Sequence, residues 1–413
     1  MAPFPKVFPD FLSLGHWGQY IIYMIIGFGF GFALEMSGFG NSKKLAAQFY
    51  FKEMTVLKVM FTAIVVAMVL VFLASGLGWL DYNLVWVNPT YLWPGIVGGL
   101  IMGVGFIVGG FCPGTSLVAA ATAKMDGIFF TLGGLFGMFL FGETVDLFDG
   151  FYNSAHKERF TLPGWLGVNT GIVVLGIVLM AIFVFFGAEQ IERLVGKRDL
   201  NKEPKWRYGA AGTLALAAMG VAFIGQPTTQ DRWKYVEDEK NKALTNREVQ
   251  IHPAELLTLM YDDRKNLIML DVRSESDYNQ FHILDTEHVP TSELDNRIPD
   301  VRLEPANSVF VLISNDETAA TEAWKTMIAE SVPNVYILEG GINNWISTFG
   351  DEKFLSAHPV IEVKDDQLRY EFTTALGARY PAALPLLEEI EGMEYTPKVK
   401  LNVASGPGGG GCG

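Results

Sequence analysis

Two cysteines, Cys112 and Cys412, are the only thiols in the 413-residue chain, and each lies where a thiol could react. Cys112 precedes Pro113, a favoured first residue of a helix, so we expect its thiol at a helix N-terminus, where anions are attracted. Cys412 follows the run ASGPGGGG, which cannot pack a core and would present the thiol on a mobile arm. Cys112 could therefore bind an anion, and Cys412 would be an exposed thiol. The alternatives are a small buried hydrophobic role for Cys112, and an engineered tail or an intermolecular disulfide for Cys412.

Apolar helices must hold Cys112 in place. Half of the chain is hydrophobic and 18% is charged, and the apolar residues gather between about Tyr20 and Gly225. Because about 20 apolar residues cross a bilayer as a helix, six stretches qualify as spans: 18–35, 54–77, 93–110, 127–147, 164–187 and 208–225. From Gln226 onward the sequence is acidic. The predicted fold class is a polytopic α-helical membrane domain, with an internal repeat and broken helices, followed by a C-terminal α/β domain.

Basic residues predict how the spans are oriented, because cytoplasmic loops are enriched in Lys and Arg. The loop between the fifth and sixth spans contains Arg193, Lys197, Arg198, Lys202, Lys205 and Arg207. With this loop inside, both termini and the soluble half lie in the periplasm of a bacterial inner membrane. Residues 1–17 lack the pattern of a cleavable signal peptide. The formal charge of −14 disfavours a nucleic-acid partner.

The membrane half repeats itself. A shift of 72 residues lays GFALEMSGFGNSKKLAA (31–47) over GVGFIVGGFCPGTSLVA (103–119), so that the Gly-Phe pairs at 38–39 and 110–111 coincide. In each copy an apolar helix runs into a Gly-rich break and then a second short helix. Transporters use such broken helices to direct helix N-termini at an anion near the membrane midplane. Close helix packing through small residues is the other explanation of the glycines.

The first half, about 225 residues, resembles a known family at these breaks. GFGNSKKLAAQFYFKEMTVLKVMFTAIVVAM (38–68) and GGFCPGTS (109–116) are similar to the YeeE/YedE sulfur-transport family. The resemblance implies a narrow path for thiosulfate or a related sulfur anion, lined by cysteine thiols. The residues expected on this path are Cys112, Pro113, Gly114, Thr115, Gly40, Asn41 and Lys44. Gly40 stands where the second copy has Cys112, and the membrane half is shorter than a full transporter.

Ionisable residues also lie in or beside the apolar stretches: Glu35, Lys58, Glu143 and Asp146. Charges at membrane depth are costly and usually serve function. Lys44 and Lys58 could therefore attract a dianion. Snorkelling of the Lys58 side chain toward the membrane surface is the alternative.

A parallel α/β sheet is predicted in the second half. The runs NLIMLDV (266–272), SVFVLIS (308–314) and NVYILEG (334–340) have strand length, and TAATEAWKTMI (318–328) has helical spacing. Over about 248–350 the sequence resembles the rhodanese family. The matching residues lie in LDVRSESDYNQFHI and LEGGINNW: Asp271, Arg273, His282, Gly340, Gly341 and Trp345.

The rhodanese resemblance implies a sulfur-accepting cysteine directly after the strand that ends at Ile313. Ser314 stands there instead, followed by Asn-Asp-Glu-Thr. A serine hydroxyl cannot form a persulfide, and Asp316 and Glu317 would repel an anionic substrate. We therefore expect an inactive rhodanese-like domain with no catalytic residue, which binds or docks a partner. A decayed domain kept for stability is the alternative.

The tail after residue 350 carries two further local patterns and the arm. DDQLRYEFTTALG (365–377) predicts a helix ended by Gly377, and YTPKVKLNV (395–403) predicts a strand. The final residues resemble the C-terminal Gly-Gly-Cys-Gly arm of the periplasmic sulfur-carrier protein of thiosulfate oxidation. This resemblance implies that Cys412 accepts sulfur covalently and passes it between partners.

Together these patterns predict a membrane protein that binds or transports a thiosulfate-like anion, with a periplasmic docking domain and Cys412 as sulfur acceptor. The expected divisions are a membrane domain (1–225, repeats about 18–77 and 93–147), a linker (226–247), a rhodanese-like domain (248–350), an extension (351–404) and an arm (405–413). Expected partners are the sulfur anion, membrane lipid, and a periplasmic sulfur-metabolism protein or membrane-complex subunits; neither a metal nor a cofactor is expected. A non-transporting accessory or anchor subunit of a larger complex, and a sulfurtransferase that relies on Cys412, remain alternatives.

Overall fold

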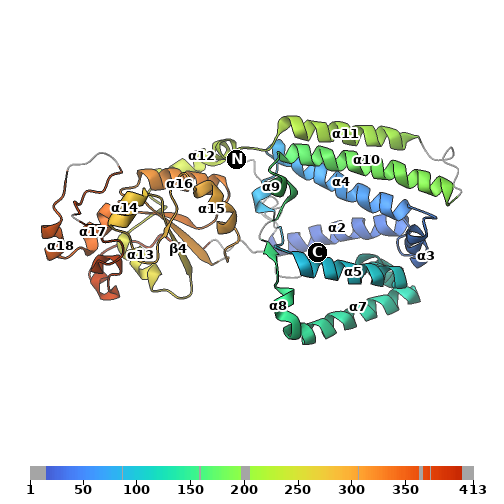
Figure 1. Cartoon of the computed structure of the whole chain (residues 1–413), viewed down its shortest axis with the longest axis horizontal. Helices are drawn as coiled ribbons and strands as arrows, with labels where there is room; N and C mark the ends of the chain where they lie inside the picture. Colours follow the sequence, from blue (N-terminus) through green and yellow to red (C-terminus); the bar gives the residue numbers. More distant parts are fainter. Residues whose placement is uncertain are drawn as a thin grey trace. The chain divides into compact units, whose positions relative to one another are not determined.

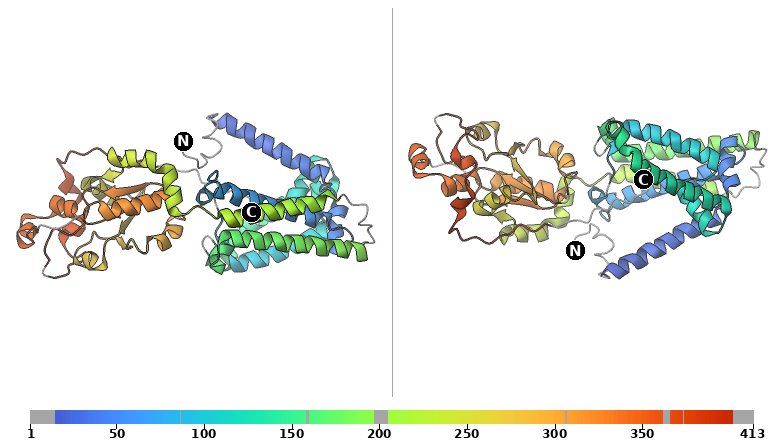
Figure 2. Two further views of the ribbon diagram at one scale, coloured as in Figure 1. Left: turned by 90° about the horizontal axis from the view of Figure 1, so that it is seen from above. Right: turned by 90° about the horizontal axis from the view of Figure 1, so that it is seen from below.

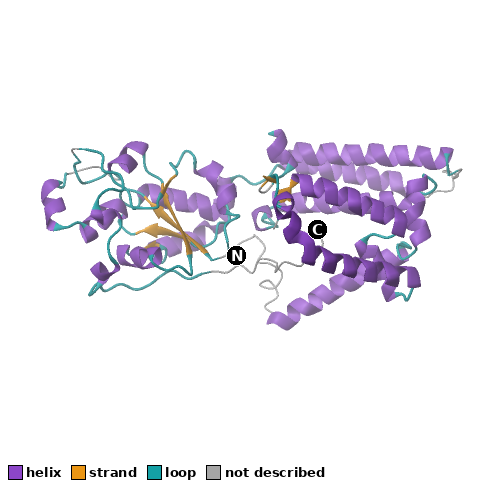
Figure 3. Ribbon diagram, turned by 60° about the horizontal axis from the view of Figure 1, so that its bottom comes forward, coloured by secondary structure: helices purple, strands orange, loops and turns teal. Residues whose placement is uncertain are grey.

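The computed structural model describes residues 15–85, 87–157, 160–196, 205–305, 307–361, 366–372 and 374–401. The chain divides into two compact units at Gln226 and Pro227. The first unit is built mainly from helices, and the second gathers five strands into one sheet with helices on its two faces (Figure 3). This confirms the predicted fold class.

Among the described residues, the membrane unit has five helical segments long and apolar enough to cross a bilayer: Thr55–Gly76, Leu92–Ala121, Met125–Tyr152, Thr170–Leu194 and Trp206–Ile224. The helix α2, Gly15–Met36, contains a shorter apolar part, Tyr20–Met36. All six predicted stretches therefore lie on apolar helices, and five of these reach full spanning length.

Three of these helices pack as one group: α4 (Thr55–Gly76), α10 (Thr170–Leu194) and α11 (Trp206–Ile224) run side by side (Figure 1). Small and β-branched side chains fill their shared core, among them Val65, Val69, Val174, Val178, Ala181, Ala218 and Val221. A Cβ on Gly171 would lie 2.6 Å from the Cα of Ala222, so the backbones of α10 and α11 touch there. Close approach through small residues is how membrane helices gain dispersion contacts.

The start of the fifth span differs from the prediction of residue 164. The short helix α9, Leu162–Leu166, ends at Gly167, whose φ of 64° is left-handed. Asn169 then caps α10, because its side chain accepts a hydrogen bond from the Gly171 amide at 2.8 Å. A left-handed glycine followed by an Asn cap is a strong helix boundary.

The remaining membrane elements carry the two repeats. The first consists of α2, the short helix α3 (Ser42–Ala46) and the 3-10 turn η1 (Ala47–Tyr50), followed by α4; the second consists of α5 (Leu92–Gly109) and α6 (Pro113–Ala121), followed by α7 (Met125–Thr144). Figure 2 shows α2 running apart from the other helices over most of its length and meeting them near its Met36 end. The smaller elements of this unit are η2 (Tyr82–Leu84), β1 (Thr90–Tyr91), η3 (Val145–Phe148), α8 (Asp149–Tyr152) and β2 (His156–Lys157).

The second unit contains a five-stranded parallel sheet in the order β3-β7-β6-β4-β5. The strands are β3 (Gln250–Ile251), β4 (Asn266–Asp271), β5 (Glu287–His288), β6 (Ser308–Ile313) and β7 (Val335–Leu338). Along β6, Val309, Val311 and Ile313 face one apolar core, whereas Phe310 and Leu312 face the other. Both faces are therefore covered, as a parallel sheet requires.

Helices supply the two covers. On one face lie α13 (Pro253–Met260) and α17 (Gly341–Phe349); on the other lie α15 (Leu294–Val301) and α16 (Thr318–Ala329). The second face is completed by α12, Thr229–Thr245, within the segment expected as a linker. Glu330 fixes α12 by accepting hydrogen bonds from Thr229, Arg232 and Arg302 at 2.5 to 2.7 Å. The remaining elements are α14 (Glu275–Gln280), α18 (Glu352–Ala357), η5 (Pro381–Ala383) and η6 (Leu387–Ile390).

The C-terminal extension differs from its local patterns. The helix predicted over 365–377 is wrong, because the described residues there form turns and irregular extended chain. Leu368 and Tyr370 are buried in the core under α17, together with Ala382 and Ala383. The described part of the segment predicted as a strand, 395–401, is also irregular; its amides at 398 and 399 donate to the Glu255 carboxylate at 2.8 Å. Side-chain partners far away in the sequence thus replace regular structure.

Candidate functional site

The second Gly-rich break is a sharp turn that presents Cys112 at a helix start. The helix α5 ends at Gly109, and Gly110 takes a left-handed φ of 71°. Phe111 turns into the core with no exposed surface, and Cys112 is the N-cap of α6, with Pro113 as its first residue. A left-handed glycine after one helix and a proline at the start of the next produce this geometry directly from the sequence.

Cys112 and Thr115 cap α6 together. The Cys112 amide donates to Thr115 Oγ1 at 3.0 Å, and the Thr115 amide donates to Cys112 Sγ at 3.5 Å. The two side-chain atoms also lie within hydrogen-bond distance, at 3.2 Å. Cys112 is half-buried, whereas Pro113 and Gly114 are exposed, and no atom of the described residues lies within 4 Å of a Cβ built on Gly114. The thiol therefore sits at the open, partially positive end of a helix.

The first break has the same turn with a different cap. Gly38 is left-handed, with a φ of 75°, and Phe39 is buried as Phe111 is. Asn41 caps α3 by accepting a hydrogen bond from the Lys43 amide at 3.1 Å. Gly40, which aligns with Cys112 in the repeat, lies one residue before this cap. The first copy thus keeps the turn but provides an amide oxygen where the second provides a thiol.

The two breaks pack against each other. Phe39, Leu45 and Val56 form one apolar cluster with Phe111 and Ala119. A Cβ on Gly110 would lie 3.1 Å from Ser42, and a Cβ on Gly40 would lie 3.8 Å from the Cα of Ala119. The Ser42 hydroxyl also donates to the carboxylate of Asp126, at the start of α7, at 2.8 Å. The repeats therefore meet at the broken-helix turns themselves.

Charged groups border this junction. Lys44 turns back on its own loop, where Nζ donates to the Ser37 carbonyl at 2.8 Å. Lys124 and Glu35 form an ion pair of 3.5 Å beside Gly40. Lys58 pairs with Glu192 at 2.7 Å, so its charge is compensated rather than offered to a dianion.

Glu192 is a residue that sequence reasoning missed. Its side chain is fully buried near the end of α10, and it accepts hydrogen bonds from the Met54 amide and from Lys58 Nζ. A carboxylate inside an apolar stretch is itself a signal of a paired charge, and the pattern at 170–194 contains two, Glu189 and Glu192. The pair ties the start of α4 to the end of α10.

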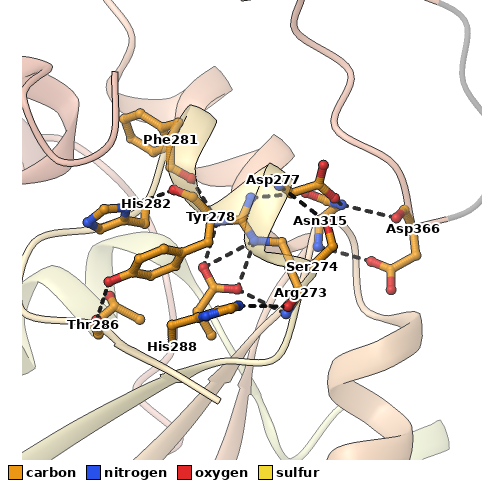
Figure 4. A network of polar contacts seen from close by, with 11 residues as sticks. Arg273, Ser274, Asp277, Tyr278, Phe281, His282, Thr286, His288, Asn315 and Asp366 are labelled. Atoms are coloured by element: carbon orange, nitrogen blue, oxygen red, sulfur yellow. Dashed lines mark hydrogen bonds and ion pairs between the residues drawn. The ribbon is translucent and has the colours of Figure 1, made fainter. Parts of the chain in front are cut away.

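Arg273 of the rhodanese motif lies in a network of polar contacts in the second unit (Figure 4). Arg273 pairs with Asp271 at 2.6 Å, and both side chains are almost fully buried. Arg273 also donates to the Phe281 carbonyl at 2.7 Å and to the Asn315 side-chain oxygen at 3.0 Å. Each buried charge is thus both paired and hydrogen-bonded, as burial requires.

His282 joins the same region through an aromatic stack. Its ring lies parallel to the Tyr278 ring at 3.8 Å between centroids, and its Nδ1 lies 2.8 Å from the Tyr278 carbonyl oxygen. His288 stacks on Tyr278 as well, at 4.6 Å. Burial is the main cause that raises the pKa of Tyr278, and its hydroxyl donates to the Thr286 carbonyl at 2.8 Å.

The loop after β6 is closed on itself. Ser314 is fully buried, and its hydroxyl has no hydrogen-bond partner among the described residues. Gly340 and Gly341 both take left-handed conformations, with φ of 66° and 60°, and the Gly340 amide donates to Glu317 at 2.7 Å. Trp345 lies buried beneath the turn and donates to the Ala382 carbonyl at 2.7 Å. The glycine pair allows α17 to begin against the loop.

Asp316 and Glu317 have structural partners. Glu317 forms a two-bonded ion pair with Arg247, at 2.7 and 2.9 Å. Asp316 accepts hydrogen bonds from the amides of Glu317 and Thr318 at the start of α16. Burial alone would raise the pKa of Asp316, but the amide hydrogen bonds outweigh it and lower that pKa. These acids are therefore compensated, although they were expected to act as free repelling charges. Cys412 lies outside the described residues.

Comparisons with known proteins agree with the two units. Residues 36–236 match the family model described as Sulphur transport, and residues 252–348 match the rhodanese-like domain. Among solved structures, BH2092 protein from Bacillus halodurans is similar at 18% identity over 27% of this chain and 80% of its own, with a TM-score of 0.22. No curated protein matches the chain. The membrane half therefore matches the Sulphur transport family, and a match to the rhodanese-like domain follows it.

Proposed function

We propose that the membrane half transports a thiosulfate-like anion past Cys112, and that the second unit acts as a periplasmic docking domain. The match of residues 36–236 to the Sulphur transport family supports a sulfur compound as the class of cargo. The observation that carries the finer proposal is the junction of the two repeats, where Cys112 caps α6 beside a second broken helix. Paired helix breaks with exposed N-termini are the way transporters hold small anions within a membrane.

Cys112 has two roles in this proposal. Its thiol is soft and polarisable, and so suits the outer sulfur of thiosulfate better than a hydroxyl would. The helix behind it contributes partial positive charge from its first amides, which offsets the anion's charge. Asn41 provides a polar group at the corresponding turn of the first repeat. The geometry therefore favours brief coordination without a covalent step.

The arm completes the proposal. Cys412, the second thiol of the chain, attacks the outer sulfur of thiosulfate as a thiolate, forms a persulfide and releases sulfite. It then presents this sulfur to the membrane site or to a partner protein. The rhodanese-like unit then serves to bring that partner close. Sulfurtransferase chemistry is assigned to neither Ser314 nor its loop, because a buried hydroxyl cannot form a persulfide.

A non-transporting accessory subunit is the second candidate, and one observation favours it. Within the most apolar window of the Met125–Tyr152 span no residue is buried, and α2 is largely exposed. Such surfaces can receive lipid or the helices of another membrane subunit.

Uptake of ³⁵S-thiosulfate into proteoliposomes separates these candidates. We expect uptake by the wild type, loss with Cys112→Ala, and retention with Cys412→Ala, which changes the other thiol. Empty liposomes control for leakage. No uptake by a correctly inserted wild type would reject transport and leave the accessory role.

A further inference from the structure

The carboxylate of Asp366, in the C-terminal extension, is bound inside the loop that follows β6. Asp366 Oδ1 accepts hydrogen bonds from the amides of Asn315 and Asp316 at 3.0 and 3.2 Å, and Oδ2 accepts one from the amide of Ala319 at 3.0 Å. Figure 4 shows Asp366 reaching Asn315 from the far side of the network. Successive amides that converge on one anion form a nest, a general anion-binding arrangement of loops.

The backbone of Asp366 is held as firmly as its carboxylate. Its amide donates to Asp316 Oδ2 at 2.6 Å, and its carbonyl accepts from the Asn315 side chain at 3.0 Å. Asp366 adopts a left-handed φ of 56°, a conformation with a steric cost for a residue that has a Cβ. The contacts at the loop therefore stabilise a backbone conformation that is sterically unfavourable for this residue.

Hydrogen bonds from neighbouring residues attach the same segment to α17. Asn343 donates to the Gln367 carbonyl at 2.9 Å and accepts from the Arg369 amide at 2.8 Å. Asn343 is itself buried. The carboxylate is thus delivered to the loop by a segment with a fixed path.

The loop has the remaining properties of an oxyanion site. The amides of Asn315, Asp316 and Ala319 come from the turn into α16, whose N-terminus adds partial positive charge. Ser314 is fully buried at the start of the loop, and its hydroxyl has no partner among the described residues. Arg273 holds the Asn315 side chain from behind at 3.0 Å, which fixes the loop's shape.

We propose that residues 314–319 form an oxyanion-binding site that the chain's own Asp366 occupies. A small oxyanion, such as acetate or thiosulfate, binds there when the Asp366 carboxylate is absent. The second unit therefore carries a complete anion site in a self-ligated, closed state. This proposal does not depend on the role assigned to Cys112.

Amide hydrogen exchange on the full chain in detergent tests the proposal. In the wild type we expect slow exchange at the amides of Asn315, Asp316 and Ala319. In Asp366→Ala these amides should exchange about tenfold faster or more, because hydrogen bonds to a charged group are lost. Added acetate or thiosulfate should restore the protection, whereas chloride at equal ionic strength should not.

Two variants make the test sharp. Asp263→Ala removes an exposed aspartate of the same unit and should leave exchange in the loop unchanged. If Asp366→Ala does not fold, Asp366→Asn keeps the shape but replaces one acceptor oxygen with a donor, and it should deprotect at least one of the three amides. Fast exchange at these amides in the wild type, or no anion-specific recovery in the folded Asp366→Ala variant, would overturn the proposal. If Asp366→Ala is unfolded, an Asp366→Asn variant whose loop amides exchange as slowly as in the wild type would also overturn the proposal.

Discussion

Gly341 lies so close to Ser314 that a Cβ built on it would stand 2.4 Å from the Ser314 carbonyl oxygen. The same Cβ would stand 2.2 Å from the Asp316 carbonyl oxygen. The contact is reinforced by the Ile342 amide, which donates to the Ser314 carbonyl at 2.9 Å. The start of α17 and the loop after β6 are therefore one packed structure, and the glycine is what permits it.

Replacement of Gly341 by alanine should therefore unfold the loop. The left-handed φ of 60° costs an alanine about 1–2 kcal/mol. The overlap with two carbonyl oxygens of the backbone adds about 1–3 kcal/mol, because neither can move without the loop. Urea unfolding measures the loss of unfolding free energy, and amide exchange in β6 and β7 shows whether the loop has opened.

Gly392→Ala is the matched control for this substitution. Gly392 also has a positive φ, of 87°, but in the described part of the chain no atom lies within 4 Å of a Cβ built there. It should show only the backbone cost, about 1–2 kcal/mol. If the two variants lose the same free energy of unfolding, the packing argument is contradicted and backbone strain is the only effect.

Local patterns were sufficient for the elements whose partners are also regular. The strands predicted at 266–272, 308–314 and 334–340 appear as β4, β6 and β7, and the predicted helix 318–328 appears as α16. These runs are apolar on both faces, which is the signature of buried parallel strands. The helix–break–helix pattern of each repeat was equally readable, because left-handed glycines and Pro113 fix it locally.

Local patterns could not predict contacts between residues that lie far apart in the sequence. Asp366 reads as a residue of a polar helix, yet its carboxylate is held by amides near residue 316. The ion pair of half-buried Lys58 with buried Glu192 joins two helices and cannot be inferred from either one. Propensity is a weak prior, and tertiary contacts override it at such positions.

Cys112→Ser and Cys112→Ala should separate capping from sulfur recognition. Serine is a good N-cap, so it should preserve α6, whereas alanine should cost about 1 kcal/mol of stability. If the thiol recognises the anion, both variants should lose thiosulfate uptake. The measurement is uptake in proteoliposomes, together with thermal unfolding of each variant. Uptake that survives in the serine variant alone would assign Cys112 a capping role only.

Gly110→Ala should disrupt the junction of the repeats. Gly110 is left-handed, and a Cβ there would lie 3.1 Å from the Ser42 carbonyl oxygen and side chain. We expect reduced thermal stability in detergent and reduced uptake.

Gly105→Ala, in the helix α5 that precedes Gly110, provides the comparison for Gly110→Ala. No described residue lies within 4 Å of a Cβ on Gly105, and alanine is the better helix former, so stability should hold or rise slightly. A Gly110→Ala variant as stable and active as Gly105→Ala would show that the turn is not needed.

Asp366 and Asp316, which meet at the loop, should give opposite pH dependences of folding stability. Burial is the main cause that raises the pKa of Asp366 above 3.8, and the charge of Asp316 adds to it. The folded chain then holds this proton more tightly than the unfolded chain, so Asp366's contribution to stability is largest below pH 3.8. It is lost as the pH rises through the raised pKa. Asp316, with its lowered pKa, contributes above pH 3.8 and loses its contribution as the pH falls through its folded pKa.

Asp366→Asn isolates the first of these effects. Just above pH 3.8, the free energy of unfolding of the wild type should fall with rising pH relative to that of the variant. Denaturant titrations at several pH values, followed by amide exchange in β6, provide the comparison. If the difference in unfolding free energy between the wild type and the variant is constant across this pH range, Asp366 does not have a raised pKa.

Ser314→Cys should not by itself create a sulfurtransferase. Transfer needs an accessible thiolate that attacks thiosulfate, forms a persulfide and releases sulfite; cyanide then removes the sulfur as thiocyanate and restores the thiolate. Residue 314 is fully buried, and the amides that would steady the anion are bound to Asp366. Adding Asp366→Ala frees those amides, so the double variant should form thiocyanate faster than either single variant. Assays in a Cys112→Ala, Cys412→Ala background remove the native thiols. Equal activity in Ser314→Cys with and without Asp366 would mean that the bound carboxylate does not close the loop to sulfur anions.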